Sequence, residues 1–187
     1  GCEPKSAPSC RHTSWQKLER VLRLSRIAIT GGMYSGKTTA CQILESLGAY
    51  LLYSDKITHN ILDHNKTCQA ELRHLFGEEI FEKGKCVRSK LANIVFANRA
   101  HLESLEKIIH PLLLDEIDQE YERVKHQLSL QGFYVELPLV QELDWNKHFD
   151  KVIAITTDEE LIFHRLTERL GKARALEAKQ EYERRMI

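Results

Sequence analysis

Short apolar runs along the chain have the pattern of strands in a buried parallel sheet. Residues 26–30 are rich in β-branched and small residues and show little alternation of polar with apolar positions. A run of this kind is typical of a strand that is covered on both faces. Further candidate strands lie at residues 49–54, 133–137 and 151–156. The pattern predicts an α/β fold with a parallel sheet.

The segments between these strands have helical periodicity. Residues 38–47 place their apolar side chains on one helical face, and Gly48 is suited to end that helix. Between the second and third candidate strands lie three more helical stretches, at residues 68–81, 88–96 and 100–128. A crossover between parallel strands needs only about a dozen residues. We therefore interpret residues 57–129 as a helical insertion beside the edge of the sheet where α/β proteins bind ligands.

The amino-acid composition gives no support to a nucleic-acid-binding protein or a membrane-spanning protein. The chain has 187 residues, of which 42% are hydrophobic, and its 27 Lys and Arg residues balance 27 Asp and Glu residues. A net charge of zero gives no support to nucleic acid as the partner, and no apolar run approaches the roughly 18 residues of a membrane span. Five cysteines, an odd number without metal-ligand spacing, fit a reducing cytoplasm best. Cys41 is expected to be a small buried hydrophobe.

A phosphate-binding loop connects the first strand to the first helix. Gly31-x-x-x-x-Gly36-Lys37-Thr38 matches the P-loop spacing in full. The glycines let successive backbone N–H groups point at an anion, and the helix N-terminus adds its partial positive charge. Lys37 is expected to reach the outer phosphates, and the Thr38 hydroxyl to hold Mg²⁺. The predicted site for a nucleoside triphosphate comprises Gly31, Gly32, Met33, Tyr34, Ser35, Gly36, Lys37, Thr38 and Thr39.

The P-loop divides the chain into functional parts. The nucleotide-binding core is expected at residues 26–56 and 130–157, with the insertion at 57–129 recognising the second substrate. Residues 158–187 are predicted to form a lid and the start of a C-terminal helix. Residues 1–25 combine a tail containing Pro and Ser with a helical stretch. We interpret that stretch as a packing helix, with an organelle-targeting segment as the alternative.

Two acids lie near the ends of the second and third candidate strands. Asp55 comes directly after the second strand, so its carboxylate is expected near the γ-phosphate. There it would accept the proton of an acceptor hydroxyl, or orient that hydroxyl with Mg²⁺. The alternative is that Asp55 is the N-cap of the next helix, and both roles are compatible. Glu136 interrupts an apolar strand, either as a group near Mg²⁺ or at the exposed end of the strand.

Two arginines are candidates to stabilise the transferring phosphate. Arg165 and Arg169 fall four residues apart, on one face of a helix that Thr157 precedes at capping-box spacing. They are predicted to act as cationic clamps, with solvated arginines as the alternative. The guanine-specificity signal of GTPases is absent, because Cys68 stands where "NKTC" would need an acid. A kinase is therefore favoured over a GTPase.

From about residue 26 onward the chain resembles the dephospho-coenzyme A kinase family. The resemblance rests on "ITGGMYSGKTTA", "LGAYLLYSDKI", "VRSKLANIVF", "LEKIIHPLL" and "ELPLVQEL", in this order. These P-loop enzymes phosphorylate the ribose 3′-hydroxyl of dephospho-coenzyme A, the last step of coenzyme A synthesis. The resemblance implies a P-loop NTPase fold with three α/β/α layers, and it implies that Asp55 is the catalytic aspartate.

The resemblance also assigns residues to the second substrate. It implies that Arg88, His110, Pro138 and Glu142 belong to the dephospho-coenzyme A site. For Arg88 the alternative is a surface arginine. The pair His110–Pro111 by itself predicts an interrupted helix, because proline lacks a backbone donor. Departures from the family pattern concern affinity for the substrate's phosphates: Tyr53 replaces the usual acid, and His59 and Leu114 stand near places where the family has arginine.

The sequence therefore predicts an ATP-dependent, Mg²⁺-requiring dephospho-coenzyme A kinase. Its expected partners are ATP and dephospho-coenzyme A, without nucleic acid or membrane, and it is expected to be a cytoplasmic monomer or weak oligomer. One alternative is a kinase of a nucleoside monophosphate or another small alcohol. The other is a catalytically inactive nucleotide-binding regulator.

Overall fold

The apolar run that follows Ser25 forms an inner strand of a parallel sheet. The structure is a computed structural model that describes residues 24–32, 34–137, 147–171 and 174. The expectations for the N-terminal helix, Met33, Pro138, Glu142 and the C-terminal helix lie outside the described residues.

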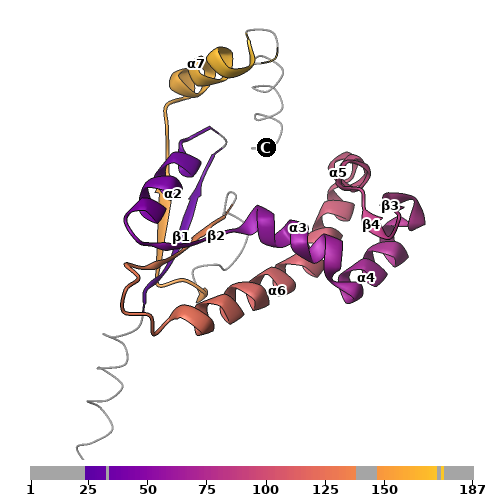
Figure 1. Cartoon of the computed structure of the whole chain (residues 1–187). Helices are drawn as coiled ribbons and strands as arrows, with labels where there is room; N and C mark the ends of the chain where they lie inside the picture. Colours follow the sequence, from indigo (N-terminus) through magenta and orange to yellow (C-terminus); the bar gives the residue numbers. More distant parts are fainter. Residues whose placement is uncertain (1–23, 33, 138–146, 172–173, 175–187) are drawn as a thin grey trace, which may run out of the picture.

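Within the described residues, the sheet has four parallel strands in the order β2-β5-β1-β6 (Figure 1). Strand β1 (Arg26–Gly31) pairs with β5 (Phe133–Glu136) on one side and with β6 (Lys151–Ile155) on the other. Strand β2 (Tyr50–Tyr53) pairs with β5. All four expected strands are present within one or two residues of their predicted bounds. The prediction of a parallel α/β sheet is confirmed.

Helices contact β2 from both faces of the sheet. Alternate residues of a strand point to opposite faces, so Tyr50 and Tyr53 point to different helices. On one face, the Tyr53 hydroxyl donates a hydrogen bond to Glu45 of α2 (Lys37–Ser46), at 3.2 Å. On the other face, Tyr50 contacts Glu120 of α6 (Arg99–Val124). Cys41 of α2 is fully buried, as expected. The result is the three-layer arrangement that the family resemblance implies.

The remaining elements lie between β2 and β5 and after β6. The first group comprises α3 (Ser54–His64), α4 (Lys66–Phe76), the 3-10 helix η1 (Glu78–Ile80), strands β3 (Phe81–Glu82) and β4 (Lys85–Cys86), α5 (Arg88–Ala97) and α6. Helix α7 (Glu159–Leu170) follows β6. In the described ranges, no helix is both long enough and apolar enough to span a membrane.

Two expectations about the helices are wrong. The helix predicted over residues 68–81 ends at Phe76, because Gly77 has a φ of 84°, which favours glycine and leaves the helical region. The chain after it forms η1 and an antiparallel hairpin of β3 with β4. The His110–Pro111 pair does not interrupt α6, which runs through it. Burial of the apolar face of α6 offsets the backbone hydrogen bond that proline lacks.

A single apolar core joins the sheet to the helices between β2 and β5. Its fully buried members include Phe133 and Val135 of β5, Leu72 of α4 and Ile117 of α6. The Phe133 ring lies edge-on to Tyr121 of α6, with ring centroids 5.2 Å apart. This packing fixes α6 against the sheet and so fixes the helices that contact α6.

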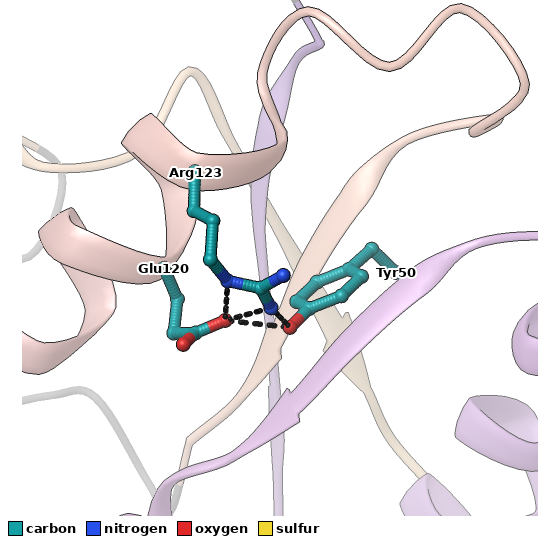
Figure 2. A network of polar contacts seen from close by, with 3 residues as sticks. All are labelled: Tyr50, Glu120 and Arg123. Carbon is teal, nitrogen blue, oxygen red and sulfur yellow. Dashed lines mark hydrogen bonds and ion pairs between the residues drawn. The ribbon is translucent and has the colours of Figure 1, made fainter.

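A polar network between β2 and α6 borders this core (Figure 2). The Tyr50 hydroxyl donates to Glu120 Oε2 at 2.6 Å and accepts a hydrogen bond from Arg123 Nη2 at 2.6 Å. Arg123 Nη2 also donates to Glu120 Oε2 at 2.6 Å. Hydrogen bonds from Arg123 and Tyr50 lower the pKa of Glu120. Burial and the hydrogen bond to Glu120 raise the pKa of Tyr50. The network ties an edge strand to the longest helix.

We expect Tyr50→Phe to lower the free energy of unfolding by about 1 kcal/mol at neutral pH, because two hydrogen bonds are lost while the ring stays stacked on Phe133. A carboxyl with a lowered pKa stabilises the fold above its ordinary pKa, and this contribution is lost as the pH falls. The difference between variant and wild type should therefore shrink below about pH 4. Urea unfolding of both proteins, at neutral pH and below about pH 4, measures this difference in the free energy of unfolding.

The control for this prediction is Tyr134→Phe. The Tyr134 hydroxyl lies in the neighbouring strand β5, and it has no hydrogen-bond partner among the described residues. Its removal is expected to leave the urea midpoint nearly unchanged. Equal losses in the two variants would show that the network does not stabilise the fold.

Candidate active site

The P-loop lies at the carboxyl end of β1, and two of its glycines are required by geometry. Gly36 is the N-cap of α2, with a φ of 99°. Gly31 has a φ of 151°, and a Cβ added there would lie 2.2 Å from the backbone oxygen of Ile155 in β6. The loop therefore needs glycine for its conformation at Gly36 and for close strand packing at Gly31. The first turn of α2 begins directly after it.

The Lys37 side chain folds back over this loop. Its Nζ donates to the carbonyl oxygens of Gly31 at 2.6 Å and Gly32 at 3.2 Å. The ammonium is thus held beside the loop backbone, where an anion would be bound. Ser35 Oγ is buried and has no hydrogen-bond partner among the described residues. Thr38 and Thr39 are exposed in the first turn of α2. The loop combines a cation, free hydroxyls and a helix N-terminus, which is the chemistry of a phosphate site.

Asp55 lies in the first turn of α3 and its side chain is exposed. The N-cap of α3 is Tyr53, without a side-chain hydrogen bond, so the interpretation of Asp55 as the N-cap is wrong. Strand β5 separates β2 from β1 in the sheet, and all three strands run parallel. Asp55 and the P-loop therefore follow the carboxyl ends of strands at the same edge of the sheet.

Glu136 lies between Asp55 and Lys37. It ends β5, where it pairs in register with Ile29 of β1 and Tyr53 of β2. Burial raises the pKa of Glu136; the Lys37 ammonium opposes this rise and the Asp55 carboxylate adds to it. These three charged groups therefore lie at one edge of the sheet, where β2, β5 and β1 end. In the sequence, the signal for this position was an acid within an otherwise apolar strand.

The segment after β6 contacts the P-loop. Thr157 Oγ1 donates to the carbonyl of Ser35 at 2.8 Å, and Arg165 Nη1 donates to the carbonyl of Tyr34 at 3.4 Å. The expected capping box is wrong, because the N-cap of α7 is Asp158 and it makes no side-chain cap. The backbone of Arg169 lies in α7, and its side chain lies outside the description. No local signal could have linked Thr157 to Ser35, which are 122 residues apart.

The residues expected at the second substrate lie on the helices between β2 and β5. Arg88 begins α5, is exposed, and its Nη1 lies 4.0 Å from Asp63 Oδ2 of α3. His110 is half-buried in α6, and burial lowers its pKa. Pro138 and Glu142 lie outside the described residues.

The oxygen atoms at this edge of the sheet fit Mg²⁺. Among the described residues, no group of three His, Cys, Asp or Glu side chains could hold a metal ion on its own. Mg²⁺ needs no such cage, because it is commonly held by one or two protein oxygens, the substrate phosphates and water. Thr38 and Asp55 are both exposed and provide a hydroxyl and a carboxylate.

Comparison with known proteins identifies the family. A sequence profile described as dephospho-CoA kinase matches residues 25–186. The chain belongs to the dephospho-CoA kinase family. A dephospho-CoA kinase of Protochlamydia amoebophila is 35% identical over 167 residues, which cover 89% of this chain and 80% of that protein. A dephospho-CoA kinase of Chlamydia muridarum is 36% identical over 151 residues, which cover 81% of this chain and 75% of that protein.

Solved structures of similar fold support the same assignment. A Thermus thermophilus protein, TT1252, has a TM-score of 0.68 at 26% identity, over 87% of this chain and 84% of that one. A dephospho-CoA kinase from Campylobacter jejuni has a TM-score of 0.53 at 28% identity, over 87% of this chain and 81% of that one. Enzymes of the dephospho-CoA kinase family use ATP as the phosphate donor, generally with Mg²⁺. The predicted family, enzyme class and fold are confirmed.

Proposed function

We propose that this chain transfers the γ-phosphoryl group of ATP to the ribose 3′-hydroxyl of dephospho-coenzyme A, giving coenzyme A and ADP. The observation that carries this proposal is the arrangement of the P-loop, Glu136 and Asp55 along one edge of the sheet, in a chain of the dephospho-CoA kinase family. The triphosphate would lie on the loop from Gly31 to Thr39, and the acceptor would approach from the side of Asp55.

Asp55 is proposed as the general base. Its exposed carboxylate would take the proton of the 3′-hydroxyl while that oxygen forms a bond to the γ-phosphorus. The bond from the γ-phosphorus to the β–γ bridging oxygen breaks in the same step, and ADP leaves. Glu136, half-buried between Asp55 and Lys37, would attract the Lys37 ammonium and repel the Asp55 carboxylate.

Lys37 and the P-loop amides are proposed to bind the β- and γ-phosphates. Lys37 Nζ would exchange its hydrogen bonds to Gly31 and Gly32 for phosphate oxygens. Thr38 and Asp55 would hold Mg²⁺, which when bound neutralises charge on the β- and γ-phosphates. Arg165 would stabilise the transferring group from the opposite side, since its guanidinium already contacts the loop at Tyr34. Arg169 is proposed as its companion from the same helix.

The helices formed by residues 57–129 are proposed to bind dephospho-coenzyme A. Arg88 is the exposed cation expected to hold a substrate phosphate, and His110 is expected to shape the surface from α6. Pro138 and Glu142, immediately after β5, complete the proposed site. The departures at Tyr53, His59 and Leu114 are expected to weaken substrate affinity rather than to change the reaction.

An ADP-release assay with and without dephospho-coenzyme A tests the proposal. We expect ADP to form with ATP and Mg²⁺ only when dephospho-coenzyme A is added, and mass spectrometry to find coenzyme A. Preferred turnover of a nucleoside monophosphate or another alcohol, in a mixture of acceptors, would support a different kinase. ATP binding without turnover of any acceptor would instead support the inactive regulator.

We further propose that the protein works in the cytoplasm as a monomer or weak oligomer, with neither nucleic acid nor membrane as a partner. Its balanced charge and its proposed small-molecule substrates support this. Sedimentation velocity on the purified chain measures the oligomeric state directly.

A further inference from the structure

Tyr34 has an unusual backbone conformation within the P-loop. Its φ is 61°, in the left-handed region that side chains other than glycine rarely adopt. An aromatic residue is strained there, and such strain persists only where surrounding contacts hold the residue in place. The phosphate loop needs no aromatic ring for binding anions through its backbone, so the contacts of this ring point to another role.

The Tyr34 ring packs against helix α7. It contacts an apolar cluster built on Ile162 and Leu166, which also includes Phe163. Leu166 is 1% exposed and Ile162 is 9% exposed. This cluster is separate from the main core that joins the sheet to α3–α6. Figure 1 shows α7 beyond the P-loop end of the sheet, apart from α4–α6. Among the described P-loop residues, Tyr34 is thus the one that packs in this cluster with side chains of α7.

Two hydrogen bonds join the same two segments. Arg165 Nη1 donates to the Tyr34 carbonyl at 3.4 Å, and Thr157 Oγ1 donates to the Ser35 carbonyl at 2.8 Å. Arg165 lies on α7 one helical turn after Ile162 and directly before Leu166. A Cβ added at Gly36 would lie 3.8 Å from Arg165 Nη1, so the guanidinium is directly beside the loop. Packing of the ring and placement of the guanidinium are therefore coupled.

We propose that Tyr34 is a positioning residue that docks α7 on the P-loop and so holds Arg165 beside the phosphate site. The ring supplies the apolar contact, and the left-handed backbone turns both the ring and the Tyr34 carbonyl toward α7. The effect on catalysis rests on the proposed kinase function, whereas the docking itself does not. One measurement therefore tests the docking of α7 by itself, and a second tests the effect of Tyr34 on catalysis.

The first measurement is hydrogen–deuterium exchange of the nucleotide-free chain. A helix of 12 residues is marginal without tertiary contacts, so α7 amides should exchange about tenfold faster in Tyr34→Gly. Glycine adopts the φ of this position without strain, so the fold is expected to survive. Unchanged exchange of the α6 amides in Tyr34→Gly would confirm that the fold survives. Tyr34→Phe, which keeps the ring, is expected to retain the protection of α7.

Matched variants on α7 complete this test. Ile162→Ala removes the opposite side of the contact and is expected to speed exchange as Tyr34→Gly does. Leu161→Ala removes an apolar side chain that is 43% exposed, and it should leave α7 protected. Wild-type exchange of α7 in Tyr34→Gly would overturn the docking, whatever the enzyme proves to catalyse.

The second measurement is a kinetic double-mutant cycle at saturating ATP and dephospho-coenzyme A. Tyr34→Gly alone is expected to lower kcat about tenfold, and Arg165→Ala by roughly 10²-fold. In the Arg165→Ala background, Tyr34→Gly should change kcat less than about twofold, because both substitutions remove the same contribution, that of the Arg165 guanidinium beside the phosphate site. Tyr34→Phe should restore most of the kcat lost in Tyr34→Gly.

The outcomes distinguish this proposal from the proposed function. Fully additive effects in the cycle would overturn the role of Tyr34 through Arg165, while coenzyme A formation by the wild type would still support the kinase. If the wild type forms no coenzyme A but α7 loses protection in Tyr34→Gly, the docking stands and the kinase function fails.

Discussion

Asp55→Asn is expected to lower kcat for coenzyme A formation by roughly 10²–10⁴-fold, with little change in the KM for ATP. The amide keeps the size of the side chain but cannot accept the proton of the 3′-hydroxyl. The side chain is exposed in the first turn of α3, so the fold should tolerate the change. Steady-state kinetics of coenzyme A formation, with ATP varied at saturating acceptor, provide both constants.

The matched control for Asp55 is Asp115→Asn. Asp115 is an exposed carboxylate on α6 that accepts a hydrogen bond from Gln119 at 2.8 Å, and it is not among the side chains proposed to contact either substrate. Its replacement should leave kcat close to the wild-type value. If Asp55→Asn retained a kcat near wild type, Asp55 would not be the base, and Glu136 would become the residue to test next.

Lys37→Met is expected to lower kcat/KM for ATP by roughly 10²–10³-fold, with both a higher KM and a lower kcat. The ammonium lies beside the P-loop backbone, at 2.6 Å from the Gly31 carbonyl, so it is positioned for phosphate oxygens. Methionine keeps an unbranched side chain of similar length and removes the ammonium, with its charge and its hydrogen bonds. Titration calorimetry with ATP–Mg²⁺, together with steady-state kinetics, separates binding from turnover.

Lys151→Met is the control for the loss of a lysine charge. Lys151 is exposed and begins β6, so it lies at the amino end of the parallel strands, away from the P-loop. This control variant should bind ATP and form coenzyme A as the wild type does. Wild-type ATP affinity and kcat in Lys37→Met would mean that the loop binds the triphosphate without its lysine, and the proposed site would be wrong.

The sequence predicted the elements that depend on local pattern. The four strands follow from apolar runs, and β1 is the strand whose burial matches this pattern most fully, because a strand buried on both faces needs apolar residues in succession. The P-loop follows from the spacing of Gly31, Gly36 and Lys37, since a tight anion-binding turn at a helix N-terminus requires that order. Five short sequence segments, in their order along the chain, were sufficient to recognise the dephospho-CoA kinase family, which the comparisons confirm.

Local pattern was insufficient where a distant contact competes with it. Pro111 marks a helix end by its own chemistry, yet α6 continues, because its buried face packs in the core with the sheet. Thr157 has the spacing of a capping residue, yet its hydroxyl bonds to Ser35 instead. In both cases a tertiary interaction outweighs a preference worth about 1–3 kcal/mol.

By itself, the sequence determined the strands, the phosphate loop and the family, because each depends on neighbouring residues and their spacing. Only the tertiary structure decided what lies beside that loop. Arg165 contacts Tyr34 across 131 residues, and Glu136 comes between Asp55 and Lys37 through the strand order β2-β5-β1. Such contacts depend on how whole elements pack, and no local spacing encodes that packing.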